Sequence, residues 1–115
     1  MNAVQPARGE IWYVDLDPTR GHEQAGERPA LVISVDDFNY GPAGLVIVLP
    51  LTRTQRHIPL HISVDPPEGG VAERSFVMCE NIRCVAKERL RRRMGQLGAN
   101  TMAEVEDRLR IVLGV

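Results

Sequence analysis

The chain has few aromatic residues and almost no lysine. Aromatic side chains make up 4% of the 115 residues, so the core has to be built mainly from Val, Leu and Ile. Lys87 is the only lysine among 14 basic residues. The formal net charge of −1 excludes a protein that is basic over its whole surface, but it leaves room for a local patch of arginines that binds phosphates.

Several common site signatures are also missing. Cys79 and Cys84 have neither a redox nor a zinc spacing, which predicts buried free thiols in a reducing compartment. His22, His57 and His61 are scattered without partners at metal-binding spacing, so neither a metal nor a cofactor is expected. The sequence contains no P-loop, no G-x-S-x-G and no dinucleotide fingerprint.

Long hydrophobic runs are absent as well. The longest apolar run, "GLVIVLPL", is far too short to span a membrane, and "MNAVQPARGE" does not look like a signal peptide. We therefore expect a soluble, cytoplasmic protein. A length of 115 residues predicts a single domain over residues 1–115.

What is present is a series of short β-strand patterns separated by turn residues. Residues 45–51, "LVIVLPL", are apolar on both faces, which is typical of a central strand. In "IPLHISV" apolar residues alternate with polar ones, His61 is expected on the exposed face, and Pro59 indicates an edge strand. The predicted strands cover residues 10–16, 30–35, 45–51, 58–64, 75–79, 82–85 and 91–97.

The end of the chain changes to a helical period. Thr101 and Glu104 match a capping box, and apolar residues between Met102 and Val112 recur on one helical face. Many short strands and one terminal helix predict a mainly β fold, with a small, strongly bent sheet or a half-open barrel.

Polar residues gather on the loop that precedes the second predicted strand. In "GHEQAGERPALVISVDD", Glu23, Gln24 and Arg28 lie just before the apolar run that starts at Ala30. Functional side chains concentrate on loops of this kind. The alternative is a solvated turn in which Arg28 pairs with a neighbouring glutamate.

A second polar loop, "PLTRTQRHIP", follows the predicted central strand. Thr52 is the first residue after this strand, and Arg53, Arg56 and His57 come next. A hydroxyl group and cations at the end of a rigid strand are suited to holding a phosphate; the alternative is a hydrophilic β-turn. A chain without the usual groups for activating water would suit RNA, whose 2′-OH is its own nucleophile.

Three segments resemble one family. "RGEIWYVDLDPTRGHEQAGERPALVIS", "VLPLT" and "VMCENIRCVAKERL" resemble the MazF/PemK toxin endoribonucleases over nearly the whole chain. The resemblance implies an SH3-like barrel related to the CcdB fold and a homodimer. It also implies sequence-selective, metal-independent cleavage of single-stranded RNA, which gives a 2′,3′-cyclic phosphate and a 5′-OH and arrests translation. The partner it implies is a small MazE-like antitoxin with an acidic C-terminal tail.

The resemblance also assigns roles to particular residues. Arg28 matches the arginine of the family's G-x-R-P motif, and Thr52 matches the threonine after the third-strand proline, so these two are the expected catalytic residues. The general base is left open between Glu23, His22 and a residue that the motif does not reveal. The residues expected to contact RNA are Gln24, Arg53, Gln55, Arg56 and Glu80.

Two alternatives remain at this point. A non-enzymatic poison of DNA gyrase would share the CcdB-like fold, but that branch relies on a tryptophan near its C-terminus, and the only tryptophan here is Trp12. A catalytically inactive RNA-binding module is the other alternative, and the intact pair of Arg28 and Thr52 disfavours it.

Overall fold

The computed structural model describes residues 5–16 and 26–115. The elements are β1 (Glu10–Asp15), β2 (Glu27–Val32), α1 (Asp36–Asn39), β3 (Leu45–Thr52), β4 (His61–Val64), β5 (Ser75–Met78), β6 (Arg83–Ala86), β7 (Leu90–Gln96) and α2 (Ala99–Leu113). Short 3₁₀ turns lie at Glu68–Gly70 and Lys87–Arg89. In the part of the chain described, neither α-helix is long and apolar enough to cross a membrane.

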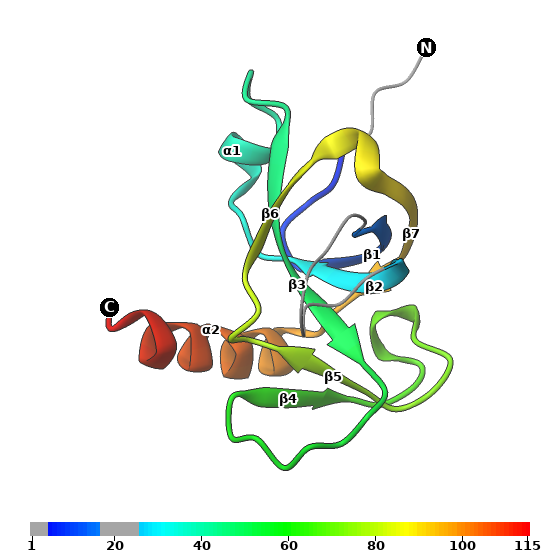
Figure 1. The fold of residues 1–115 in the computed structure, drawn as a ribbon, viewed down its shortest axis with the longest axis vertical. Coiled ribbons are helices and arrows are strands. Elements are labelled where there is room, and N and C mark those ends of the chain that lie inside the picture. Colours follow the sequence, from blue (N-terminus) through cyan, green and yellow to red (C-terminus); the bar gives the residue numbers. More distant parts are fainter. Residues whose placement is uncertain (1–4, 17–25) are drawn as a thin grey trace.

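The strands form one antiparallel sheet that bends around β3 (Figure 1). Its order is β4-β5-β3-β2-β1-β7, and β6 also pairs with β3. The first half of β3 pairs with β6 and its last two residues pair with β5, so β3 passes from one part of the sheet to the other. This arrangement confirms the predicted mainly β fold with a C-terminal helix.

The core is aliphatic, as the composition predicts. One buried cluster lies between α2 and the β3–β5–β4 part of the sheet and includes Leu49, Leu51, Val77 and Val105. A second cluster, which includes Val14, lies inside the curved part formed by β1, β2, β3 and β6. Removing such side chains from water is the main favourable contribution to folding.

The strand boundaries differ most from the predicted ones at β2 and β4, and elsewhere by about one residue. β2 begins at Glu27 rather than at residue 30, so Arg28 lies in a strand, paired with Val14, and not on a loop. Pro29 is tolerated because β2 pairs only with β1 there, and the ladder to β3 starts one residue later. The predicted strand over 58–64 is shortened to β4, which is an edge strand as expected.

The exposure of two side chains was predicted wrongly. The side chain of His61 is only 3% exposed, although its strand face was expected to meet solvent. Cys79 is buried as expected, whereas Cys84 is exposed. Period-2 alternation identifies the two faces of a strand, but it does not reveal which loops cover the outer face.

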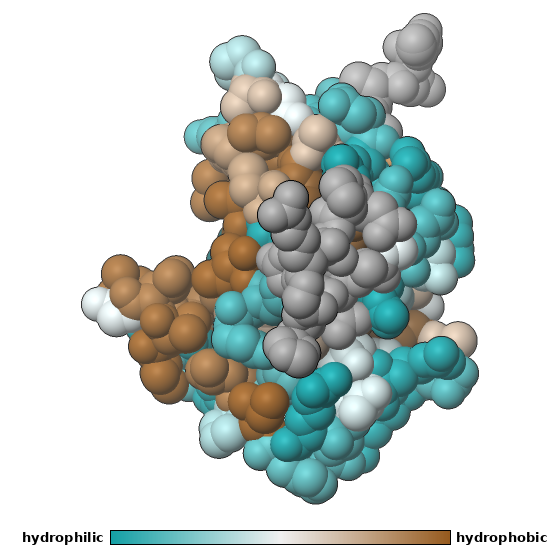
Figure 2. Space-filling view, viewed as in Figure 1, coloured by the Kyte–Doolittle hydropathy of each residue, from teal (hydrophilic) through white to brown (hydrophobic). Residues whose placement is uncertain are grey.

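The terminal helix α2 starts earlier than the predicted capping box. Gly98 is the N-cap residue, so Thr101 lies inside the helix and caps nothing with its side chain. The N–H of Gly98 instead donates to the carboxylate of Glu68 at 2.9 Å. Val105 anchors the helix in the core, and the last turn leaves apolar side chains exposed, visible as the brown end of the helix in Figure 2.

Candidate active site

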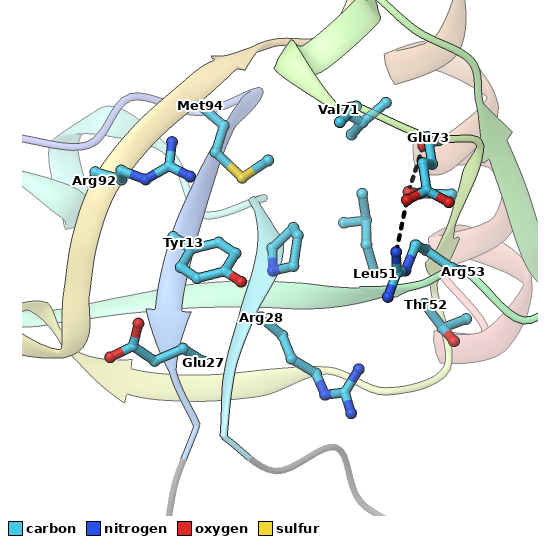
Figure 3. Close-up of a pocket in the computed structure, with 13 residues that line it drawn as sticks. Tyr13, Glu27, Arg28, Leu51, Thr52, Arg53, Val71, Glu73, Arg92 and Met94 are labelled. Carbon is cyan, nitrogen blue, oxygen red and sulfur yellow. Dashed lines mark hydrogen bonds and ion pairs between the residues drawn. The ribbon is translucent and has the colours of Figure 1, made fainter.

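A cavity with a volume of about 430 Å³ lies at the ends of β2 and β3, beside β1 and β7. Both residues predicted to be catalytic, Arg28 and Thr52, line it, and so does Arg53 (Figure 3). The other lining residues are Tyr13, Glu27, Pro29, Leu51, Val71, Ala72, Glu73, Ser75, Arg92 and Met94. We call this space the first cavity.

The register of β2 and β3 explains why Arg28 and Thr52 come together. Ala30 pairs with Pro50 at the end of the β2–β3 ladder. Continuing that register by two residues brings Arg28 opposite Thr52, since each step along one antiparallel strand is matched by a step back along the other. Two residues far apart in the sequence thus face one cavity from the ends of neighbouring strands.

The hydroxyl of Thr52 is held in a defined place. Thr52 is 6% exposed, and its Oγ1 accepts a hydrogen bond from the N–H of Thr54 at 3.2 Å. A hydroxyl that accepts in this way still has its own hydrogen to donate. Thr52 is therefore a fixed donor at the end of a buried strand, which suits recognition of a phosphate oxygen.

Two further arginines frame the first cavity on opposite sides (Figure 3). Arg53 forms an ion pair with Glu73 at 2.8 Å, and both side chains are well exposed. The guanidinium of Arg92 lies over the ring of Tyr13 at 5.2 Å from its centroid, a cation–π geometry. Together with Arg28 they make the cavity cationic, with Glu73 and Glu27 as its carboxylates.

Arg92 was not among the predicted site residues. The signal was present in "RRRM", because alternate residues of a strand share a face, which places Arg92 with Met94 and separates both from Arg91 and Arg93. Arg91 and Arg93 instead form ion pairs with Asp15 and Glu10, at 3.2 and 2.6 Å. Only the middle arginine of the run faces the cavity.

Close backbone packing sets the position of the wall opposite β7. Gly70 has a φ of +74°, and a Cβ built on it would lie 2.0 Å from the carbonyl oxygen of Met94. A Cβ on Gly95 would lie 2.5 Å from the carbonyl carbon of Gly69. Neither position admits a side chain, so the turn at Glu68–Gly70 packs directly on β7, and the chain that leaves this turn lines the cavity with Val71 and Glu73.

The remaining predicted residues lie elsewhere. Gln55 and Arg56 line a smaller second cavity of about 180 Å³, and Glu80 hydrogen-bonds to His61 beside it. His22, Glu23 and Gln24 fall outside the described residues. Among the residues described, no cluster of His, Cys, Asp or Glu is arranged to hold a metal ion.

Comparison with known proteins places this geometry in a family. Residues 7–113 match the family model described as the PemK-like, MazF-like toxin of type II toxin–antitoxin systems. The chain is a member of this toxin family.

Individual relatives agree with that assignment. The toxin is 35% identical over 111 residues to endoribonuclease MazF9 of Mycobacterium tuberculosis, covering 92% of this chain and 94% of the relative. MazF of Deinococcus radiodurans has a TM-score of 0.84 and 30% identity, over 97% of this chain and 99% of that one. An endoribonuclease from a mycobacterial species, solved in complex with its cognate antitoxin, has a TM-score of 0.80 and 26% identity, over 96% of both chains.

Proposed function

We propose that this toxin is an endoribonuclease that cleaves single-stranded RNA selectively at short sequences, with Arg28 and Thr52 as its catalytic residues. The observation that carries the proposal is that both side chains line one cationic cavity at the ends of β2 and β3. The relative named endoribonuclease MazF9, which covers almost the whole chain, supports the activity. The consequence in the cytoplasm is loss of messenger RNA and arrest of translation.

The proposed reaction uses a nucleophile that the substrate carries. The 2′-oxygen attacks the adjacent phosphorus, the bond from phosphorus to the 5′-oxygen breaks, and the products are a 2′,3′-cyclic phosphate and a 5′-OH. A proton leaves the 2′-OH and a proton reaches the departing 5′-oxygen, so no water and no metal ion enters the chemical step.

The two catalytic residues stabilise the charge that builds up on the phosphate. Thr52 donates its hydroxyl hydrogen to a phosphate oxygen, and the guanidinium of Arg28 is a bidentate partner for the phosphate. An arginine keeps its proton in proteins, so Arg28 acts as an electrostatic clamp or acid rather than as a base. The candidates for the base that takes the 2′-OH proton are Glu23 and His22, both outside the described residues, or a further residue that the family motif does not reveal.

One assay separates this function from its alternatives. Purified toxin is incubated with a long single-stranded RNA in EDTA, and the ends of the fragments are analysed. We expect cleavage with 2′,3′-cyclic phosphate ends. Intact RNA together with inhibited gyrase would support the gyrase poison, and intact but bound RNA would support an inactive binding module. The only tryptophan, Trp12, lies in β1, where its Nε1–H donates to Glu10 at 3.0 Å, whereas the gyrase poison relies on a tryptophan near its C-terminus.

The proposed partner is a MazE-like antitoxin whose acidic C-terminal tail occupies the first cavity. Arginines arranged to hold phosphates hold carboxylates through the same donors, so tail and RNA should compete. The related toxin solved with its cognate antitoxin supports such a partner. The test is a titration of antitoxin into toxin bound to RNA that is uncleavable at the 2′ position; simultaneous binding without loss of affinity would contradict a shared site.

We also propose that the toxin is a homodimer. Ile111 and Leu113 at the end of α2, and Val115 just after it, are 58–83% exposed, and apolar patches of this kind mark contact surfaces. Light scattering after gel filtration tests this, with twice the 12.8 kDa chain mass expected and the single-chain mass contradicting it.

A further inference from the structure

Arg92 in β7 is held by an aromatic ring alone. Its guanidinium lies 5.2 Å from the centroid of the Tyr13 ring, and it forms no hydrogen bond or ion pair with any residue that the structure describes. The N–H donors of this guanidinium are therefore not used by the described part of the fold. Arg92 is exposed, so a ligand in the first cavity can reach these donors.

The two arginines next to it in β7 differ from Arg92 in this respect. Arg93 forms an ion pair with Glu10 at 2.6 Å, and Arg91 forms one with Asp15 at 3.2 Å. An arginine that already has a carboxylate partner gains less from a new anion, because the existing ion pair has to be given up first. Of these three arginines, only Arg92 has no carboxylate partner among the described residues.

The two carboxylates that line the first cavity are also paired with other arginines. Glu73 binds Arg53 at 2.8 Å, and Glu27 lies 3.8 Å from Arg91, which is not part of the cavity lining. Neither carboxylate forms an ion pair with Arg92. The β7 side of the cavity thus presents a positive charge without a counter-charge in the described part of the chain, and clefts lined by such charge concentrate anions.

Tyr13 fixes the position of this charge. Tyr13 and Arg92 are directly paired across β1 and β7, and directly paired residues project from the same face of a sheet. The planar guanidinium of an arginine stacks on an aromatic face, while its N–H groups lie in its own plane. The edge of the Arg92 guanidinium can therefore bind an anion through two parallel hydrogen bonds, and less side-chain freedom is lost when it does so.

Arg92 is placed to contact a different anion from the one assigned to Arg28 and Thr52. Tyr13 pairs with Pro29 on its other side, so Arg92 lies two strands away from the residue next to Arg28. Neighbouring strands are about 4.8 Å apart, which puts the backbone of Arg92 roughly 10 Å from that of Pro29. Figure 3 shows the two guanidinium groups on opposite sides of the Tyr13 ring.

We propose that Arg92 is a second phosphate-binding residue of the first cavity, and that it holds a phosphate of the RNA close to the bond that is cleaved but not at it. The proposal rests on the ribonuclease function above and adds a binding residue to it. Each nucleotide of a single strand carries one phosphate, so an RNA whose scissile phosphate meets Arg28 and Thr52 brings further phosphates into the same cavity. Tyr13 is a positioning residue, because it acts through Arg92.

A second phosphate contact fixes the direction in which the RNA crosses the cavity. An interaction that is equally strong with the substrate and with the transition state strengthens binding without accelerating the chemical step. Loss of Arg92 should therefore act mainly by raising KM, whereas loss of Thr52 should lower kcat. This split distinguishes a residue that binds a distant phosphate from one that acts on the scissile phosphate.

The first experiment locates the phosphate. In RNA that is uncleavable at its 2′ position, one phosphate at a time is replaced by an uncharged methylphosphonate, and the affinities for wild type, Arg92→Gln and Arg93→Gln are measured. We expect one phosphate, within about two nucleotides of the scissile bond, whose replacement weakens wild-type binding about threefold to tenfold and leaves the affinity of Arg92→Gln unchanged. Arg93→Gln is the matched control: it removes the same charge from the same strand and should respond as wild type does.

A second experiment tests the charge and its support. Arg92→Gln should lower the slope of log affinity against log salt by about 0.7, while Arg93→Gln keeps the wild-type slope. Tyr13→Leu should weaken RNA binding about threefold, and Tyr13→Phe should weaken it less, because the ring is kept. Thermal unfolding followed by circular dichroism shows that each variant is folded. All of these are binding measurements, so RNA that is bound through Arg92 but never cut would refute the ribonuclease function alone.

Three results would overturn the proposal. The first is a methylphosphonate scan in which every replacement weakens Arg92→Gln as much as wild type. The second is an equal loss of affinity and of salt slope in Arg92→Gln and Arg93→Gln, which would reduce the effect to overall charge. The third is a loss of affinity for the antitoxin without any loss for RNA, which would assign Arg92 to the carboxylates of that partner.

Discussion

The two cavities lie on one sheet, yet the charged groups of the first are held differently from the loop side chains of the second. In the first cavity the charged groups sit on or beside strands and are engaged: Arg53 with Glu73, Arg92 with Tyr13. In the second cavity the loop side chains of Gln55, Arg56 and His57 have no partner among the described residues. Side chains held by partners suit catalysis, which requires a fixed geometry. Loop side chains without partners suit discrimination between RNA sequences.

The largest effect is expected from removing the strand-held groups. Arg28→Ala and Thr52→Ala should each lower the cleavage rate by about 10²–10³-fold, because each removes a proposed donor to the transition-state phosphate. Thr52→Ser, which keeps the hydroxyl, is the control and should retain most activity. Near wild-type rates in both alanine variants, with folding and mass unchanged, would show that the first cavity is not the catalytic site.

The close packing that fixes one wall of the first cavity can be tested at Gly95, which contacts the backbone of Gly69 and Gly70. Gly95→Ala should lower the free energy of unfolding by about 1–3 kcal/mol, because the new Cβ meets the backbone of Gly69 and Gly70. The cleavage rate should fall as well, since β7 and the facing wall move apart. Gly98→Ala is the control; its Cβ meets only the end of the Glu68 side chain at 3.4 Å, and it should cost under about 1 kcal/mol. Equal Tm values for the two variants would contradict the close packing.

The salt dependence of RNA binding should distinguish Arg56, which has no ion pair among the described residues, from Arg53, which is paired with Glu73. Arg56→Ala should lower the slope of log affinity against log salt by about 0.7, the value for one phosphate contact on a single strand. Arg53→Ala should lower it less, because Arg53 is already paired with Glu73. The measurement is binding of an uncleavable RNA at several salt concentrations, and identical slopes for wild type and Arg56→Ala would show that Arg56 contacts no phosphate.

A smaller effect is expected from Glu10 in β1, whose carboxylate accepts a hydrogen bond from Arg93 in β7. Burial raises the pKa of the Glu10 carboxyl, but hydrogen bonds from the Ala7 N–H, Trp12 and Arg93 lower it more, so the net pKa lies below 4.5. A lowered folded-state pKa stabilises the protein above the unfolded-state pKa, and this contribution is lost as pH falls through the folded-state value.

Glu10→Gln should therefore lower the free energy of unfolding at pH 7 by about 1 kcal/mol. The difference from wild type should shrink as the pH falls below about 4.5, the ordinary value for a glutamate. Denaturant titrations at a series of pH values measure it, with the exposed Glu88→Gln as control. A difference that stays constant down to acidic pH would mean that the charge of Glu10 plays no part.

Local patterns in the sequence were sufficient to predict most strands and the terminal helix. Alternation and apolar runs are short-range signals, and "LVIVLPL" was correctly placed at the centre of the sheet. The capping box at Thr101 was wrong because Gly98 and Glu68, thirty residues apart, satisfy the helix start instead. Long-range contacts of this kind leave no trace in a local pattern.

The sequence predicted some of the cavity-lining residues and missed others, because long-range contacts bring these residues together. Arg28 and Thr52 were chosen from the family motif, and their shared cavity depends on the β2–β3 register, which hydrophobic pattern alone did not fix. Alternation in "RRRM" separates Arg92 from its neighbours, but which face meets the cavity depends on the pairing of β7 with β1. The second cavity was invisible because Ser63, Phe76 and Thr52 form a row only once β4, β5 and β3 are paired.

In the proposed reaction the substrate's own 2′-OH is the nucleophile in the first cavity. The most direct measurement compares a short RNA that the toxin cleaves at one site with the same RNA carrying a single deoxyribose at the nucleotide 5′ to that bond. We expect this one missing oxygen to abolish cleavage, in EDTA as in its absence, while binding affinity stays within a few-fold. Cleavage of the deoxy-substituted RNA at the same bond would rule out this mechanism, because another nucleophile would then have to attack the phosphorus.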